Sequence, residues 1–305
     1  MKIKFWGVRG SIPSPGPEFV KYGGNTLCVE LCLEDLDRWI IIDAGSGLRL
    51  LGNELMTRKV SNQTLRVDIF LTHTHLDHIL GFPFFAPIFQ NRTRLNIYGP
   101  VTCENDSLEA VLGGQLSYRY FPIRQAELAA DIDYINLKEG RFDLGDGIQL
   151  TTKYLNHPLL CLGFRFEYKG KICCTAYDTE PFLNLFSTDP HDPAFDASMA
   201  HEGAAAACDE NLRLEEFFTG ADLLIHDAQF TQQEYDASKR GWGHSPLEYA
   251  IQSALRSQVN RLALFHHDPM RTDAQLDALA EMHCDSHGSD STRVFFAREG
   301  MMVEI

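Results

Sequence analysis

Six short apolar runs in this chain each stop at a histidine or an aspartate. The polar residues at these points are Asp43, His73, His157, Asp178, the pair His226 and Asp227, and the pair His266 and His267. Apolar runs of this length, bounded by turn residues, predict strands buried on both faces. In an open α/β sheet, ligands bind beyond the carboxyl ends of the strands. We therefore expect these polar side chains to gather along one edge of the fold.

Helical patterns alternate with the predicted strands. The segment GHSPLEYAIQSALRSQ predicts a helix with Ser245 as its N-cap, Pro246 in its first turn and Glu248 closing a capping box. RTDAQLDALAEMH predicts another, capped by Thr272, and GLRLLGNELM and NLRLEEFF predict shorter ones. Alternating strands and helices indicate a layered α/β domain, and we predict one domain over residues 1–305.

Residues 187–210 fit neither pattern. They carry several aspartates, two prolines and a run of alanines, without the alternation of a strand. We interpret this stretch as a long loop inserted in the domain, with one helical turn or the role of a mobile lid as alternatives.

Residues 71–81, LTHTHLDHILG, concentrate metal-binding side chains. His73 and His75 are two residues apart, so on an extended segment their imidazoles point the same way. Asp77 and His78 follow where the chain must turn, and Gly81 suits that turn. Imidazole nitrogens and carboxylate oxygens bind Zn²⁺, Mn²⁺ or Fe at about 2.0–2.2 Å. A single histidine is usually structural, but this cluster after a buried strand indicates one cation with a second beside it.

The same segment resembles the signature of the metallo-β-lactamase fold, a four-layer αββα sandwich with metals at one edge. FWGVRGSIPSPG and YGGNTLCVEL resemble the opening of its phosphodiesterase branch, which includes ribonuclease Z, and LNHPLLCLGFRFE, AYDTE and LFHHDP resemble its later ligand motifs. The resemblance implies two divalent ions, one held by His73, His75 and His157 and one by Asp77, His78 and His266, with Asp178 and a hydroxide between them. The residues alone leave His266 and His267 as alternatives, and the resemblance favours His266.

Two metals about 3.5–4 Å apart activate water and bind the oxygens of a displacement at phosphorus. The leaving alkoxide also needs a proton, and His244 in GWGHSP is the predicted general acid, oriented by Asp227 or His226. The alternative for His244 is a helix-entry residue that packs against Trp242. The predicted catalytic residues are thus Asp77, His244, Asp227 and His226. Arg9, Ser11 and Asn25 are predicted to bind the substrate phosphate, although they suit turns equally well.

The charge balance guides the choice of substrate. The chain has a formal net charge of −15, and residues 102–140 are more acidic than basic where a basic arm that grips tRNA is expected. Because nucleic acids bind through Lys and Arg, this disfavours extended nucleic acid as a partner. We predict hydrolysis of a small phosphodiester, a cyclic nucleotide, by attack of a metal-bridging hydroxide.

Other functions remain as alternatives. They are tRNA 3′-end processing as in ribonuclease Z, and a non-catalytic sensor or redox di-iron role on the same fold. The N-terminus lacks the apolar core of a signal peptide, no apolar run reaches about 18 residues, and eight cysteines include no C-x-x-C pair. These features predict a cytoplasmic protein without membrane contact, and the resemblance implies a homodimer.

Overall fold

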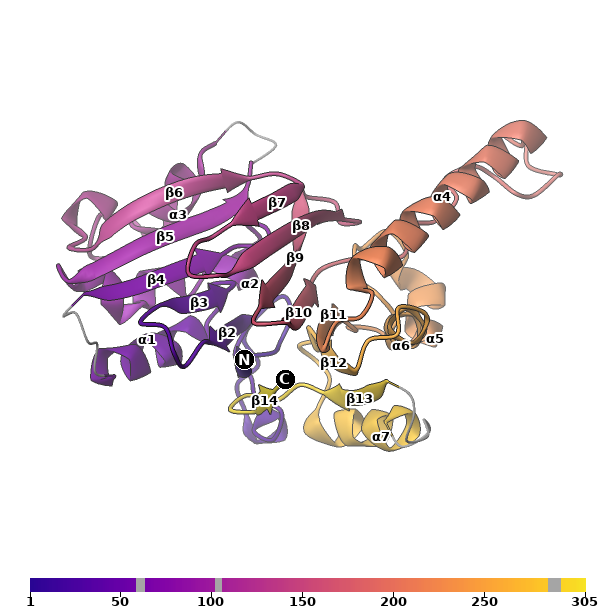
Figure 1. Ribbon diagram of the computed structural model, residues 1–305. Helices are drawn as coiled ribbons and strands as arrows, with labels where there is room; N and C mark the ends of the chain where they lie inside the picture. The colour runs from indigo at the N-terminus through magenta and orange to yellow at the C-terminus, as the bar shows by residue number, and fades with distance from the viewer. Residues whose placement is uncertain (59–63, 102–105, 285–291) are drawn as a thin grey trace.

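The computed structural model describes residues 1–58, 64–101, 106–284 and 292–305. Two seven-stranded mixed sheets pack face to face, and helices cover the outer face of each (Figure 1). The arrangement is the four-layer αββα sandwich of the metallo-β-lactamase fold, as predicted. Both chain ends lie near β14, at the edge of the first sheet (Figure 1).

The first sheet has the order β14-β1-β2-β3-β4-β5-β6, and β3 to β6 run parallel. Its strands are β1 (Lys2–Gly7), β2 (Cys28–Cys32), β3 (Trp39–Ile42), β4 (Leu65–Phe70), β5 (Thr93–Pro100), β6 (Asp131–Leu137) and β14 (Met302–Glu304). The HTHLDH segment directly follows β4.

The second sheet has the order β13-β12-β11-β10-β9-β8-β7, and β10 to β13 run parallel. Its strands are β7 (Gly140–Asp143), β8 (Gln149–Leu155), β9 (Cys161–Tyr168), β10 (Lys171–Ala176), β11 (Leu223–Asp227), β12 (Arg261–Phe265) and β13 (Arg293–Phe296). Because β10, β11 and β12 are parallel, the segments that follow them emerge at one edge.

Helices complete the outer layers. The α-helices are α1 (Leu48–Thr57), α2 (Leu76–Ile79), α3 (Leu108–Gln115), α4 (Ala197–Phe218), α5 (Gln232–Glu234), α6 (Leu247–Arg256) and α7 (Asp273–His283). Short 3₁₀ turns are η1 (Pro17–Phe19), η2 (Phe82–Phe84), η3 (Ala86–Phe89) and η4 (Gln125–Glu127), and η5 (Tyr235–Lys239) is a π-turn. α1 and α3 pack on the first sheet, and α4, α6 and α7 on the second.

The continuous apolar runs are explained by burial on both faces of each strand. In β3, Ile40 and Ile42 pack between the sheets, whereas Ile41 packs in the helix layer. In β12, Phe265 packs between the sheets and Leu264 faces the helices of the other layer. Burying such a side chain contributes about 1.5–3 kcal/mol. This packing fixes each strand end, and with it each polar residue that follows.

The prediction of a loop at 187–210 is wrong over its second half. Residues 197–210 belong to α4, which is 22 residues long and projects away from the sandwich (Figure 1). Asp196 caps it by accepting hydrogen bonds from the backbone of Ser198 and Met199. The alanine run has high helix propensity, but α4 is mostly exposed, so its sequence lacks an apolar stripe. Among the described residues, no helix combines the length and apolarity that a membrane span requires.

The N-cap prediction for α6 is also wrong. Pro246 occupies the cap position, and no side chain caps the helix. The Ser245 hydroxyl instead donates to the carbonyl of Thr179, and Glu248 accepts a hydrogen bond from the backbone of Gln232. Tertiary partners thus replace the local capping box. α7 does begin as predicted, with Thr272 and Gln275 forming a capping box.

Candidate metal centre

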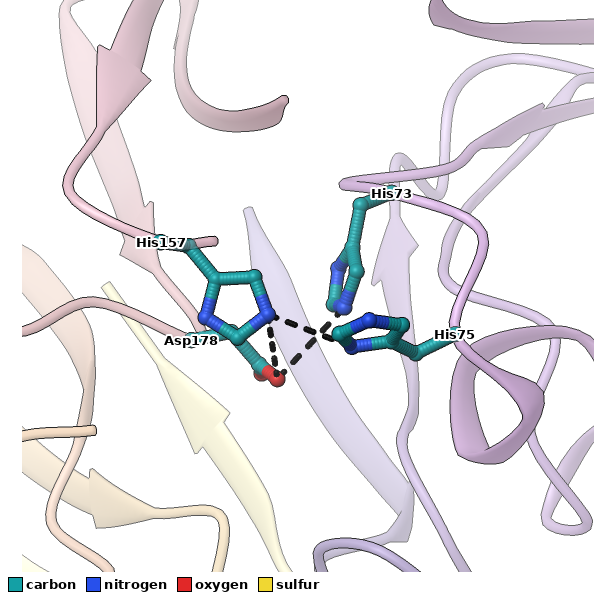
Figure 2. Close-up of side chains that lie close together, drawn as sticks. All are labelled: His73, His75, His157 and Asp178. Atoms are coloured by element: carbon teal, nitrogen blue, oxygen red, sulfur yellow. Dashed lines mark hydrogen bonds and ion pairs between the residues drawn. The ribbon is translucent and has the colours of Figure 1, made fainter. Parts of the chain in front are cut away.

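Three histidines meet one aspartate where the two sheets come together (Figure 2). Nδ1 of His75 lies 3.2 Å from Nε2 of His157. Nε2 of His73 and Nε2 of His157 lie 3.6 and 4.0 Å from Oδ2 of Asp178. The side chains of His73 and His157 are buried, whereas His75 is exposed. We call His73, His75 and His157 the first ligand group.

A second cluster lies on the other side of the same aspartate. It consists of Asp77, His78 and His266, all buried, and we call these residues the second ligand group. Oδ2 of Asp77 lies 3.6 Å from Nε2 of His78 and 3.5 Å from Nε2 of His266. Both of these imidazole nitrogens lie 3.2 Å from Oδ1 of Asp178. Asp178 therefore directs one carboxylate oxygen toward each group.

The spacing and the unpaired atoms of these groups fit divalent cations. A tetrahedral ion with bonds of about 2.1 Å holds its ligand atoms about 3.4 Å apart, close to the separations in the second group. Nε2 of His73, His78 and His266 and Oδ1 of Asp178 are buried without a hydrogen-bond partner among the described residues. Leaving a buried polar atom unsatisfied costs about 1–3 kcal/mol. Coordination of a cation removes that cost, so the cluster suits divalent metal ions.

Burial and charge act in opposite directions on the titratable groups. Burial lowers the pKa of His78 and of His266, but nearby carboxylates, chiefly that of Asp178, raise both pKa values well above the ordinary one. Burial alone raises the pKa of Asp178, yet the surrounding imidazoles hold it well below its usual range. In the first group, burial lowers the pKa of His157 to about 4. The carboxylates thus favour positive charge in the second group. A bound cation would supply that charge in place of protons.

A buried carboxylate next to the ligands orients His78. Oδ2 of Asp43 lies 2.7 Å from Nδ1 of His78, and Asp43 also accepts hydrogen bonds from the backbone and hydroxyl of Thr72. With Nδ1–H donated to a carboxylate, Nε2 is the ring atom that faces Asp178 and that would bind a cation. Asp43 ends a buried apolar run in the sequence, but no role for it could be predicted from that position alone. The only sequence cue for its role was its position directly after a buried strand. In the structure, β3 ends level with β4, and Asp43 therefore lies beside the residues that follow β4.

Strained backbone accompanies the residues that follow buried strands. Asp43, Asp178 and His266 have φ values of 61°, 42° and 60°, in the left-handed region. Such conformations cost on the order of 1–3 kcal/mol each and persist only when the surroundings enforce them. They turn each side chain into the site immediately beyond its strand.

Two glycines leave room for histidines of the site. A Cβ on Gly10 would lie 2.2 Å from the ring of His266, and a Cβ on Gly243 would lie 2.4 Å from the ring of His157. Gly243 has a φ of 81°, and its carbonyl oxygen lies 3.0 Å from Nδ1 of His157. This contact orients His157 as Asp43 orients His78.

The structure separates the neighbouring histidines that the residues alone left as alternatives. His266 points into the second ligand group, as described above. His267 points away, and its Nε2 donates to the carbonyl of Ala297. Burial lowers the pKa of His267 to about 3.

His244 lies beside both ligand groups. Its ring stacks on that of His266 with a centroid separation of 4.7 Å, and lies 5.5 Å from the ring of His157. Nδ1 of His244 lies 2.8 Å from Oδ2 of Asp227, a buried carboxylate. His226 does not share this role, because successive residues of β11 face opposite ways, and its Nδ1 bonds the backbone carbonyl of Asp227. Of the two predicted partners for His244, the structure brings only Asp227 to it.

Glu180 is a buried residue that the sequence predictions missed. Its carboxylate accepts hydrogen bonds from the backbone N–H groups of Gly241 and Gly243 and from the hydroxyl of Tyr235. Glu180 thereby links two segments, the turn that contains His244 and the segment that contains Asp178. A glutamate two residues after a site aspartate was the only sequence signal.

The predicted phosphate contacts require correction. The guanidinium of Arg9 is fully buried and donates to the backbone carbonyls of Gly23, Asp268 and Arg271, so it braces loops instead of facing a substrate. Asn25 is likewise engaged, since its side-chain amide donates to Glu299 and accepts from Ser46. Only Ser11 touches the site, where its backbone N–H donates to Oδ2 of Asp77.

Comparison with known proteins agrees with this geometry. Residues 38–184 match the Beta-lactamase superfamily domain. Ribonuclease Z of Lactococcus lactis subsp. lactis (strain IL1403) is 28% identical over 302 residues, which cover 87% of this chain and 88% of that protein. The crystal structure of human tRNase Z, short form, has a TM-score of 0.61 at 21% identity and covers 100% of this chain and 99% of that one. The metallo-beta-lactamase fold protein YhfI from Bacillus subtilis has a TM-score of 0.64 at 18% identity, covering 99% of both chains.

These relatives contradict the prediction of a small substrate with extended nucleic acid disfavoured. Their names specify a ribonuclease and a tRNase. Net charge is an average over the whole surface, whereas phosphate groups bind to local patches of positive potential, so a net charge of −15 does not exclude RNA. The names of the ribonuclease Z and tRNase Z relatives describe hydrolytic enzymes. The chain is a metal-dependent hydrolase of the metallo-β-lactamase fold, of the phosphodiesterase type and similar in sequence to the ribonuclease Z proteins.

Proposed function

We propose that this enzyme is an endonuclease that cleaves a phosphodiester bond in the 3′ part of a tRNA precursor. The observation that carries the phosphodiesterase chemistry is Asp178, whose two carboxylate oxygens face two separate ligand groups. The ribonuclease Z relatives, which match over most of the chain, support RNA as the substrate.

Two divalent ions, Zn²⁺ or Mn²⁺, would be held by the two ligand groups, with Asp178 shared between them. When bound, such a pair supplies Lewis acidity toward phosphate oxygens and lowers the pKa of water. The protein's part is to hold the ligands in place. Asp43 and the Gly243 carbonyl fix the rings of His78 and His157, and Ser11 fixes Asp77 through its backbone.

His244 is positioned to protonate the leaving oxygen. Its Nδ1–H donates to Asp227, which leaves Nε2 as the atom that can deliver a proton. Asp227 is fully buried, so its carboxylate holds the ring of His244 in a fixed orientation. The side chain of His244 is 13% exposed and can exchange protons with solvent between turnovers.

The test uses a tRNA precursor with a 3′ extension, the same RNA without the extension, and cyclic mononucleotides, each with Mn²⁺ and with Zn²⁺. We expect one cut that shortens the extended precursor and leaves the mature RNA intact. Asp178→Asn should abolish the cut, while Asp209→Asn, at an exposed position on α4, should not change it. Turnover of cyclic nucleotides without cleavage of the RNA would overturn the proposal.

Elemental analysis addresses the ions separately. Protein purified without chelator should hold about two divalent ions per chain, since each ligand group has three protein ligands besides Asp178. A chain with at most one ion at full activity would contradict the two-ion assignment.

A further inference from the structure

The loop that leads to His244 presents an aromatic side chain to solvent. Trp242 is 56% exposed, although tryptophan is one of the most apolar side chains and is usually well buried. It lies two residues before His244 and next to Gly243, which packs on the ring of His157. The Cα atom of Trp242 is about 3.8 Å from that of Gly243. Trp242 is therefore separated from His157, a member of the first ligand group, only by Gly243.

The loop around Trp242 is held from both sides. The N–H groups of Gly241 and Gly243, which flank Trp242, both donate to the buried carboxylate of Glu180. Both glycines have a φ of 81°, which other residues rarely adopt. The backbone of Trp242 also donates to the carbonyl of Lys239. An exposed ring on a backbone fixed in this way is a preorganised surface for a ligand.

A positive charge lies against the same ring. Nζ of Lys239 is 3.7 Å from the ring centroid of Trp242 and 5.3 Å from that of Phe230. Of the eight lysines that the structure describes, six form ion pairs, and Lys239 is one of the two that do not. Phe230 in turn lies 6.1 Å from the ring of His244. In a chain with a net charge of −15, an unpaired ammonium beside the metal centre favours an anionic ligand.

We propose that Trp242, backed by Lys239, is a nucleotide subsite that stacks the base next to the scissile phosphate. Lys239 covers one face of the indole, and the base occupies the opposite face. Stacking suits an enzyme that cuts chains of varied sequence, because every base has a π-face. The proposal rests on the proposed function in that the ligand is part of a nucleic acid, and it specifies which residues recognise a nucleoside.

The alternative is that Trp242 only stabilises its loop. A purely structural tryptophan affects all substrates alike, because it acts through the position of His244. A stacking residue affects only substrates that carry a base. The two roles are therefore distinguished by substrates that differ in the nucleoside alone.

The experiment compares the 3′- and 5′-(p-nitrophenyl phosphate) esters of thymidine with methyl p-nitrophenyl phosphate. All three share the leaving group, so stacking of the nitrophenyl ring cancels. We expect Trp242→Ala to lower kcat/KM for at least one thymidine ester by about 5- to 150-fold, the range for loss of one stacked base, and to change the methyl ester by less than about twofold. Trp242→Phe should restore most of the loss, and Met282→Ala, exposed on α7, should change none of the three.

The outcomes distinguish failure of the proposed subsite from failure of the proposed function. Equal losses on the methyl and thymidine esters, or no loss on any of them, would overturn the subsite. Wild-type enzyme that cleaves the esters but not the tRNA precursor would overturn the proposed function, while a loss confined to thymidine esters would still support the subsite. Metal content of Trp242→Ala should match that of wild type, which checks that the ligand groups are intact.

Discussion

The two ligand groups of the metal centre take their residues from the same parts of the chain but differ in access and charge. Each combines two residues of the HTHLDH segment with one histidine from the second sheet, and they share Asp178. The first group is made of imidazoles and opens to solvent at His75. The second group is buried throughout and contains a carboxylate of its own, Asp77, with Asp43 behind it.

This difference indicates that the two groups differ in metal affinity and in access to water and substrate. A buried group with additional negative charge holds a cation more strongly, because weak screening increases the attraction. The exposed edge at His75 leaves room for exchange of water or substrate. We therefore expect the second group to be the tighter site and the first group to be the more open one.

Removing the shared ligand tests whether the two groups act as one centre. Asp178→Asn keeps the shape of the side chain but removes the charge that faces both groups. We expect loss of at least one ion and a fall in kcat/KM beyond the roughly 10²–10⁴-fold that a general acid contributes. Elemental analysis and turnover of bis(p-nitrophenyl) phosphate measure these effects. An Asp178→Asn protein with both ions and near-normal turnover would show that the groups do not depend on this carboxylate.

Replacing His244 tests the residue that lies beside both groups without belonging to either. We expect His244→Ala to reduce cleavage of RNA, whose leaving alkoxide needs a proton, by about 10²–10⁴-fold. Turnover of p-nitrophenyl esters should fall only mildly, because nitrophenolate leaves without protonation. Metal content should be unchanged, and His201→Ala, at an exposed position on α4, is the matched control. Equal losses on both substrates, or loss of an ion, would instead identify His244 as a ligand or a structural residue.

Asp43 contacts the second group directly and reaches the first group only through Thr72, whose hydroxyl lies 3.2 Å from Nδ1 of His73. Its carboxylate bonds Nδ1 of His78, and residues in such positions typically change metal affinity about 10–100-fold when replaced. We expect Asp43→Asn to lower the affinity for one ion by that factor and to leave the other unchanged. Titration of the metal-free protein with Zn²⁺ measures both affinities. If both affinities fell together, Asp43 would support both ligand groups and not the second group alone.

The sequence predicted the parts of this site that are local. The buried strands could be predicted from their continuous apolar runs. Such runs arise because both faces of each strand are covered, one by the other sheet and one by helices. His73 to His78 were readable because a strand followed by a turn brings them together within six residues. Assignment of His157, Asp178 and His266 to particular groups needed the family resemblance, since their separation along the chain carries no geometric information.

The remaining errors concern tertiary partners. Arg9 was predicted to bind phosphate because its guanidinium can donate hydrogen bonds, yet it donates them to the backbone carbonyls of residues 268 and 271. Glu180 was missed because its partners, Gly241 and Gly243, lie some 60 residues away. The N-terminal part of α4 was missed because an exposed helix needs no apolar face, whereas its C-terminal end, NLRLEEFF, was predicted to be helical.

His267 provides the smallest test, because it borders the second group without taking part in it. Burial lowers its pKa from about 6.5 to about 3, so between these pH values the unfolded chain binds more protons than the folded protein. Stability contributed by neutral His267 is therefore present above about pH 6.5 and is lost as the pH falls toward 3. His267→Gln keeps a donor for the Ala297 carbonyl but does not titrate. Urea unfolding of metal-free protein should show that wild type loses about 1 kcal/mol more than His267→Gln between pH 6.5 and 5.5. Metal content and kcat should not differ between the two proteins at pH 7.5. Parallel pH profiles of stability would show that His267 takes up a proton as readily in the folded protein as in the unfolded chain. A loss of metal would place His267 among the ligands.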